Sequence, residues 1–348
     1  FWRHPACGDH GARDRTVLIR ADARSIPLRD GCVQCVVTSP PYWGLRDYGM
    51  SAQLGMEQTP EAYVSDLADI FDDVRRVLRA DASCWVNLGD SYQNAKGQAH
   101  GVDPKQPARR HGLRPQDVRV VGLKPKDLVG VPWLFGFEAR RRGWYLRSDI
   151  IWSKPNPMPE SVTDRPTKSH EYLFLLTKSE RYYYDAQAIA EPVSVAMLDQ
   201  IDQGYDGLGL KDYQGAGVQN PSSVKARIIA NARRKQDLAG NRTRAVFNDR
   251  YDFKAERLTR NARTVWTIPT MPYAGAHFAT MPEALVEPCI LAGSRPGDLV
   301  FDPFIGSGTV GMVAERFDRR WVGTDLNPAY HELAKERTSQ RGLRFEDV

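Results

Sequence analysis

Residues 302–311 contain a glycine pattern that can bring a protein backbone close to a bound nucleotide. Gly306, Gly308 and Gly311 form a G-x-G-x-x-G sequence between a predicted strand and a predicted helix. Glycines at such a junction permit a tight turn and close contact with a ligand. Asp325 ends the next predicted strand, where a carboxylate can accept hydrogen bonds from the hydroxyls of an adenosine ribose. A glycine-rich turn without a ligand is the alternative, and the position of this carboxylate argues against it.

The glycine loop opens with Asp302-Pro303-Phe304 rather than with a glycine. This start favours a wall against an adenosyl group over a cradle for a pyrophosphate. Only one helix is predicted after Asp325, so a Rossmann-like sheet must take its other strands from elsewhere in the chain. The candidates are "TVLIRAD" at 16–22, "CVVTS" at 35–39 and "SCWVNLG" at 83–89. The expected sheet is therefore circularly permuted.

Three motifs together resemble those of the exocyclic-amino DNA methyltransferases. "DPFIGSGT" at 302–309 resembles their cofactor loop, "VGTDLNPAY" at 322–330 their ribose carboxylate, and "TSPPYW" at 38–43 their catalytic tetrapeptide. The order, with the catalytic motif first, resembles the beta group, and the resemblance covers residues 16–185 and 264–338. It implies S-adenosyl-L-methionine as cofactor and an α/β fold. That fold is a Rossmann-like class I methyltransferase sheet, circularly permuted, with an irregular target-recognition module inserted.

The Ser-Pro-Pro-Tyr sequence suits methylation of an exocyclic amino group. Such a nitrogen is a poor nucleophile because its lone pair is delocalised into the ring, so acceptors must be aimed at its two N–H bonds. Ser39 can supply a hydroxyl oxygen and Pro40 a backbone carbonyl, while consecutive prolines hold the carbonyls rigidly. Tyr42 offers a flat face for a base extruded from the duplex, and Trp43 extends that platform or lines the opening. A proline-rich strand terminator with core aromatics is the alternative.

Ser39 also bears on which base is methylated. By resemblance, Ser-Pro-Pro-Tyr is most often found in cytosine-N4 enzymes and Asp-Pro-Pro-Tyr in adenine-N6 enzymes. We expect transfer to cytosine N4, and adenine N6 stays open because serine can polarise either amino group. A nicotinamide-dependent oxidoreductase is a further alternative, but it lacks contiguous Rossmann strands and gives "TSPPYW" no role. A catalytically silent DNA-binding protein is the last alternative.

The resemblance assigns further positions. Asp22 would bond the adenine amino group of the cofactor, or else cap its own turn. Thr280 would reach the cofactor's carboxylate, and "NLGDSY" at 87–92 would shape the base pocket. The expected catalytic residues are Ser39, Pro40, Pro41 and Tyr42. The expected cofactor-binding residues are Asp22, Asp302, Pro303, Phe304, Gly306, Ser307, Gly308, Thr309, Asp325 and Thr280.

Positive charge is concentrated in one segment. The whole chain carries a formal net charge of +5. From Lys225 to Arg263 there are twelve Lys/Arg and four Asp/Glu, a local +8, which leaves −3 for the remainder. Such a segment suggests a polyanion partner, with a solvated loop as the alternative. The expected DNA contacts are Trp43, Arg165, Lys168, Arg233, Arg234 and Lys235.

Composition places the chain among globular proteins, with 41% hydrophobic and 26% charged residues. It has no apolar run long enough for a membrane helix, and its start, without Met or a signal-peptide pattern, suggests a trimmed cytoplasmic protein. Five sparse cysteines argue against a disulfide framework. The single Cys32-x-x-Cys35 pair makes zinc conceivable, but no metal is expected. Double-stranded DNA is the expected partner, a cognate restriction endonuclease without direct contact stays open, and the chain is expected as a monomer or homodimer.

The expected organisation is a catalytic half at 16–184, a target-recognition region at 185–263 and a cofactor-binding half at 264–348. Apolar spacing predicts helices over 59–81, 126–143, 281–293, 309–317 and 328–338. Strands are predicted over 16–21, 34–38, 83–89, 144–155, 170–185, 298–304 and 319–326. Thr59 followed by Pro60 predicts the start of the first helix.

Overall fold

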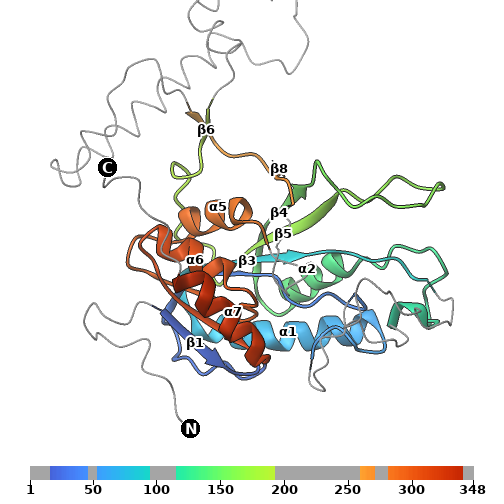
Figure 1. Ribbon diagram of the computed structural model, residues 1–348, viewed down its shortest axis with the longest axis horizontal. Helices are drawn as coiled ribbons and strands as arrows, with labels where there is room; N and C mark the ends of the chain where they lie inside the picture. Colours follow the sequence, from blue (N-terminus) through green and yellow to red (C-terminus); the bar gives the residue numbers. More distant parts are fainter. Residues whose placement is uncertain (1–15, 46–52, 95–114, 193–258, 271–280, 340–348) are drawn as a thin grey trace, which may run out of the picture. The chain divides into compact units, whose positions relative to one another are not determined.

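The computed structural model describes residues 16–45, 53–94, 115–192, 259–270 and 281–339 (Figure 1). The chain divides into two units, one of residues 1–189 with 263–348 and one of residues 190–262. In the described part of the second unit, β6 (Glu191–Pro192) pairs antiparallel with β7 (Thr259–Arg260). An ion pair of 3.0 Å between Arg260 and Glu191 joins the same two strands, which therefore bring together the ends of the intervening segment.

A mixed sheet forms the centre of the first unit. Within the described residues it has eight strands in the order β1-β10-β9-β2-β3-β5-β4-β8. Neighbours are parallel except for β5, which runs antiparallel to both β3 and β4. The strands are β1 (Thr16–Arg20), β2 (Val33–Thr38), β3 (Leu78–Leu88), β4 (Tyr145–Ser153), β5 (His170–Thr177), β8 (Val265–Thr267), β9 (Leu299–Asp302) and β10 (Arg320–Asp325).

The strand order confirms the predicted circular permutation. The two C-terminal strands, β9 and β10, lie between the N-terminal strands β1 and β2. β9 pairs with β2 in the register Cys35↔Val300 and Val36↔Phe301, and β10 pairs with β1 over five residues. Segments from opposite ends of the sequence therefore form adjacent parallel strands, whose carboxyl ends meet at one edge of the sheet.

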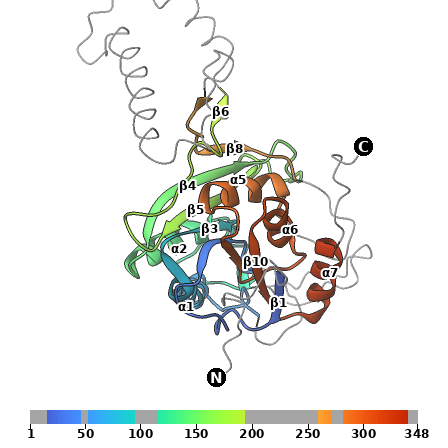
Figure 2. The same cartoon turned by 90° about the vertical axis from the view of Figure 1, so that its left-hand side faces the viewer.

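Helices cover both faces of this sheet because its strands are apolar on both sides. Val36 belongs to a core cluster with α1 and α2, whereas its neighbours Cys35 and Val37 belong to a cluster with α5 and α6. This is the two-residue alternation of a strand, and Figures 1 and 2 show these helix pairs on opposite sides of the sheet. The helices are α1 (Pro60–Val77), α2 (Val131–Arg141), α5 (Glu283–Gly293), α6 (Thr309–Arg316) and α7 (Pro328–Ser339), with a 3₁₀ turn at Pro115–Asp117. No helix in these described ranges has the length and apolarity that a bilayer crossing requires.

Helix α1 begins where the sequence predicts and ends earlier. The Thr59 hydroxyl accepts a hydrogen bond of 3.1 Å from the Ala62 N–H, as an N-cap does. The helix stops at Val77 rather than at residue 81, because Leu78 is extended and pairs with Val33 of β2. Helix α2 likewise starts late, at Val131, after Gly130 at φ 82°. Strand pairing and a left-handed glycine thus override the helical spacing at these boundaries.

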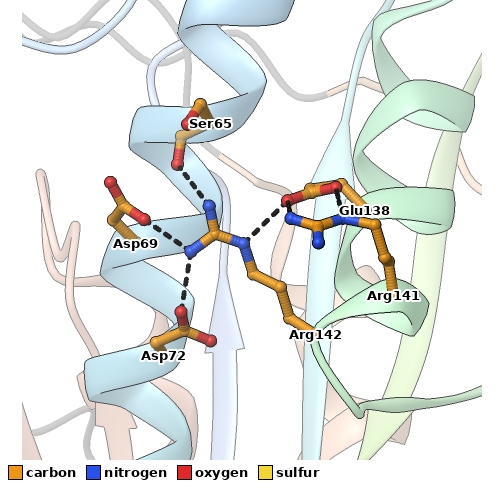
Figure 3. A network of polar contacts seen from close by, with 6 residues as sticks. All are labelled: Ser65, Asp69, Asp72, Glu138, Arg141 and Arg142. Atoms are coloured by element: carbon orange, nitrogen blue, oxygen red, sulfur yellow. Dashed lines mark hydrogen bonds and ion pairs between the residues drawn. The ribbon is translucent and has the colours of Figure 1, made fainter.

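Arg142 links the two helices on one face of the sheet (Figure 3). Its guanidinium donates to Asp69 at 2.5 Å and Asp72 at 2.7 Å, both on α1, and to Glu138 of α2 at 2.8 Å. The Arg142 side chain is 17% exposed, whereas Arg141, which also pairs with Glu138, is 71% exposed. The multiple partners and partial burial make Arg142 the more important of the two arginines for stability.

We therefore expect Arg142→Met to lower the free energy of unfolding by about 1–2 kcal/mol, because it removes charge-assisted bonds between α1 and α2. Arg141→Met is the matched control, and we expect no measurable loss from it. Urea unfolding of both variants checks this, and equal stabilities would contradict the role given to Arg142.

Candidate active site

The Ser-Pro-Pro-Tyr segment and the glycine loop follow adjacent parallel strands. Thr38 is the last residue of β2, and Asp302 is the last residue of β9. The Thr38 hydroxyl donates a hydrogen bond of 2.6 Å to Asp302 Oδ1, and both side chains are buried. Ser39 and Pro303 thus begin their loops side by side, at the edge of the sheet where ligands bind in folds of this kind.

Burial changes the acidity of Asp302. Its side chain is 2% exposed, and this desolvation raises its pKa to about 7, although hydrogen bonds from Thr38 and the Phe304 N–H act in the opposite direction. The nearby Asp325 carboxylate adds a smaller upward shift. A proton on Asp302 at neutral pH therefore costs little, and the residue serves as a buried connection between the two loops.

The glycine loop turns sharply between β9 and α6. Gly306 has φ 47° and Gly308 has φ 81°, both in the region that favours glycine. A Cβ on Gly308 would lie 3.0 Å from the backbone of Ala334 in α7, so a side chain there meets a second obstacle. Ser307 and Thr309, in contrast, accept hydrogen bonds of 2.7 and 3.0 Å from Arg337 of α7. Their hydroxyls stabilise the loop from the helix side.

Asp325 ends β10 with a carboxylate that suits a ribose. Oδ2 accepts from the Gly306 N–H at 3.2 Å, and Oδ1 accepts from the Asn327 N–H at 2.8 Å. A carboxylate oxygen can accept more than one hydrogen bond, so acceptor capacity remains, and burial raises the pKa of the carboxyl. Two positioned carboxylate oxygens beside a left-handed glycine turn fit the paired hydroxyls of an adenosyl group.

The remaining predictions for the cofactor site concern Asp22 and Thr280. Arg20 of β1 pairs with Asp325, so Asp22 follows two residues beyond that point. Its carboxylate accepts from the Arg24 backbone N–H at 2.9 Å and pairs with the Arg24 guanidinium at 3.2 Å. This is the turn-capping arrangement named as the alternative, and it leaves the adenine contact a prediction. Thr280 lies outside the described residues.

A partly buried polar network surrounds Ser39. Its hydroxyl donates to the Tyr42 oxygen at 3.3 Å, and the Tyr42 hydroxyl donates to Glu171 Oε2 at 2.6 Å. The Asn87 amide, at the end of β3, donates to Tyr42 at 2.7 Å, to Glu171 at 2.8 Å and to Ser39 at 3.5 Å. Lys154 pairs with the other Glu171 oxygen. Separate segments of the chain therefore converge on the serine hydroxyl.

Contacts from α1 and from the chain after β3 hold the Ser-Pro-Pro-Tyr segment in place. The Tyr63 hydroxyl of α1 donates to the Pro41 carbonyl at 2.9 Å. Gly89 lies against the Tyr42 ring so closely that a Cβ would be 2.5 Å from Cε2. The aromatic ring thus has a fixed position between its hydroxyl partners and the chain after β3.

Trp43 is a correction to the sequence-based expectation of a DNA contact. Its ring is 1% exposed and packs in the core with α1, and its indole N–H donates to the Glu57 carbonyl at 2.9 Å. An aromatic residue after a catalytic loop can equally close the core beneath it, and Trp43 does so. It supports the loop from inside rather than extending the platform.

The other expected DNA contacts have varied surroundings. Arg165 pairs with Glu160 at 2.7 Å and lies 3.8 Å over the Tyr92 ring. Lys168 is partly buried and donates to the Asp90 carbonyl, and this burial lowers the pKa of its ammonium group. Both side chains are thus engaged within the protein, and their contact with DNA stays a prediction. Arg233, Arg234 and Lys235 lie outside the described residues.

Glu171 and Lys154 belong to the network around Ser39, although the sequence motifs did not predict them as catalytic or cofactor-binding residues. Among the described side chains no cluster of three or more His, Cys, Asp or Glu could hold a metal ion. The sequence carries one signal for Glu171, since this glutamate precedes "YLFLL" on a strand. A charged side chain at the start of a buried strand needs partners. The pairing of β5 with β3 places Asn87 beside Glu171, and its pairing with β4 places Lys154 there.

Solved structures define the fold to which this arrangement belongs. The PvuII DNA methyltransferase, described as cytosine-N4-specific, matches with a TM-score of 0.55 and 16% identity, covering 95% of this chain and 89% of that one. A putative DNA modification methylase from Thermus thermophilus, complexed with S-adenosyl-L-methionine, matches with a TM-score of 0.52 and 22% identity, covering 93% of each chain. The fold is therefore the Rossmann-like class I methyltransferase fold, as predicted.

Sequence comparison then gives the family. The DNA methylase model for N6- and N4-methyltransferases matches residues 33–336. Type II methyltransferase M.Cfr9I of Citrobacter freundii is 44% identical over 322 residues, covering 92% of this chain and 86% of that protein. M.SmaI of Serratia marcescens is 44% identical over 326 residues, covering 93% and 91%. The chain belongs to this DNA methylase family, which confirms the resemblance and, with it, S-adenosyl-L-methionine as the cofactor.

The contact between Gly89 and Tyr42 yields a first prediction for the site. We expect Gly89→Ala to lower the methylation rate on DNA by about tenfold or more, because the added methyl must displace the Tyr42 ring. Gly136→Ala in α2 is the control, since its Cβ would meet Phe174 at an ordinary 3.5 Å. Single-turnover methylation of both variants checks this, and an unchanged rate in Gly89→Ala would contradict it.

Asp302 yields a prediction of pH dependence. Its pKa is about 7 in the folded protein and near 3.8 in the unfolded chain, so between these values the folded state holds a proton that the unfolded state releases. Wild-type stability therefore loses a contribution as pH rises from about 4 to 7. Asp302→Asn cannot titrate, so its stability relative to wild type should increase by about 1–3 kcal/mol between pH 5 and 8. Urea unfolding at several pH values measures this, and parallel curves for the two proteins would disprove it.

Proposed function

We propose that this chain transfers the methyl group of S-adenosyl-L-methionine to the N4 amino group of a cytosine flipped out of double-stranded DNA. The observation that carries the proposal is the bond between Thr38 and Asp302. It joins the segment that bears the amino-group acceptors to the loop that suits the methyl donor. Donor and acceptor groups held on adjacent strands favour an in-line transfer.

In this proposal the bound cofactor supplies an electrophilic methyl group on its sulfonium. Asp325 binds the ribose hydroxyls, and the glycine loop approaches the adenosyl group closely. Ser39 Oγ and the Pro40 carbonyl accept hydrogen bonds from the two N–H bonds of the target amino group. These acceptors draw the nitrogen toward tetrahedral geometry and free its lone pair for attack. Tyr42 stacks on the extruded base.

Cytosine is favoured over adenine by the residue at position 39. A serine hydroxyl is neutral, and the resemblance associates it with cytosine-N4 enzymes. Adenine N6 is the second candidate, because a hydroxyl can accept from either amino group. Arg233, Arg234 and Lys235, in the most basic part of the sequence, are proposed to contact DNA phosphates together with Arg165 and Lys168.

The test combines product analysis with one substitution. Purified chain, labelled S-adenosyl-L-methionine and unmodified DNA should give N4-methyldeoxycytidine after nuclease digestion. Ser39→Ala should lower the transfer rate by about 100-fold with unchanged cofactor affinity, because it removes an acceptor used in the transition state. Ser65→Ala, on the exposed surface of α1, is the control and should transfer at the normal rate.

The outcomes separate the candidates. N6-methyldeoxyadenosine as the sole labelled product would replace cytosine N4 with adenine N6. An undiminished rate in Ser39→Ala would remove this residue from the mechanism. Absence of any labelled nucleoside on varied unmodified DNA, with the cofactor bound, would contradict the proposed reaction as a whole.

A further inference from the structure

Glu171 is a partly buried charged group that Tyr42 connects to the proposed catalytic serine. It is the second residue of β5, and its side chain is 15% exposed. One oxygen accepts from Tyr42 at 2.6 Å and from Asn87 at 2.8 Å, and the other pairs with Lys154. A carboxylate placed this deeply is costly, so these partners must compensate for the water it has lost.

Glu171 is ionised in this setting. Burial alone would raise its pKa, but the charge of Lys154 and the hydrogen bonds from Lys154, Tyr42 and Asn87 outweigh it, so the pKa lies below its usual value. Lys168 is a further cation whose electrostatic field reaches Glu171. An ionised carboxylate has no proton to donate and acts only as an acceptor.

This property determines the direction of every hydrogen bond between Glu171 and Ser39. Tyr42 has one hydroxyl proton, and it goes to Glu171. The Tyr42 oxygen then acts as acceptor, so the bond of 3.3 Å from Ser39 uses the serine's only proton. Ser39 is left with lone pairs alone to present to a substrate. If these hydrogen bonds ran in the opposite direction, the serine proton would point at the amino group from which Ser39 must accept a hydrogen bond.

We propose that Glu171 is a positioning residue for methyl transfer, which orients Ser39 as an acceptor through Tyr42 and takes up the proton that the amino group releases. This inference rests on the proposed function. It assigns a role to the ion pair of Glu171 with Lys154. Asn87 assists by donating to both Tyr42 and Glu171, which holds the two oxygens at hydrogen-bond distance.

The proton balance of the step is complete without another reactant. The amino nitrogen's lone pair forms a bond to the methyl carbon, and the carbon–sulfur bond breaks, with its electrons left on sulfur as a neutral thioether. The nitrogen becomes cationic and gives one proton to Ser39 Oγ. The serine proton passes to the Tyr42 oxygen, and the tyrosine proton passes to Glu171, which becomes a neutral acid. A carboxylate of low pKa suffices, because loss of the proton restores conjugation between the nitrogen and the ring.

The test uses Glu171→Gln, Tyr42→Phe and the double variant of the full chain. Glutamine keeps the shape of the side chain but removes the charge that sets the hydrogen-bond direction. We expect each single variant to lower the single-turnover methylation rate by about 100-fold, a typical loss for positioned proton transfer, while dissociation constants for cofactor and DNA stay within about threefold of wild type. The double variant should be no slower than the slower single variant, because both substitutions interrupt the same series of hydrogen bonds.

Glu180→Gln is the matched control. Glu180 follows the same strand, is 75% exposed and has only a distant ion pair of 3.9 Å with Arg181. The Glu180→Gln variant should methylate DNA at the wild-type rate. Thermal unfolding of all variants identifies any loss of folded protein, and Tyr42→Phe retains the pair of Glu171 with Lys154 if Glu171→Gln is unstable.

The failure of this inference is distinct from failure of the proposed function. Wild-type methylation together with a normal rate in folded Glu171→Gln or Tyr42→Phe would overturn the role of Glu171 and leave the proposed function intact. Multiplicative losses in the double variant would also overturn it, because they would show that the two residues act separately. Lack of methylation by the wild-type chain would instead count against the proposed function.

Discussion

The hydrogen bond between Thr38 and Asp302 is the contact on which the site depends. Each residue ends a buried parallel strand, and the bond of 2.6 Å sets the spacing between the two loops that follow. On one side this fixes the start of the Ser39 segment, and on the other it fixes the turn at Gly306. A side-chain bond can do this only because β2 and β9 are already paired by their backbones. The site is thus a product of strand order.

Two polar systems of different kinds serve these two loops. The glycine loop is held by the Gly306 N–H, which donates to Asp325, and by Arg337 on α7, which donates to Ser307. The Ser-Pro-Pro-Tyr segment is held by side chains of a network that includes the partly buried ion pair of Glu171 with Lys154. Backbone donors suit a turn that must approach a ligand closely. A side-chain network suits a site in which the direction of a proton matters.

Much of the fold could be predicted from the sequence because its central strands are continuous apolar runs, bounded by glycine, proline or aspartate. The glycine loop and Asp325 could be recognised by their spacing along the chain, which corresponds to one turn and one helix. The predicted helix boundaries at residues 81 and 126 were wrong. Strand pairing ends α1 at Val77, and α2 begins only at Val131, after Gly130. The Glu171 network depends on pairing between β3 and β5, a long-range contact without a signal in local spacing. Trp43 shows a second limit of sequence-based prediction. An aromatic residue beside the Ser-Pro-Pro-Tyr motif looks the same in the sequence whether it faces DNA or the core.

The interleaving of β9 and β10 between β1 and β2 has a consequence for synthesis of the protein. The ribosome makes β1 and β2 before β9 and β10, yet in the finished sheet β9 and β10 lie between β1 and β2. A nascent chain that still lacks β9 and β10 therefore has a gap in the middle of its sheet, without the turn at Gly306 or the carboxylate of Asp325. A product that stops before Leu299 therefore lacks the strands, the turn and the carboxylate from which the candidate cofactor site is built.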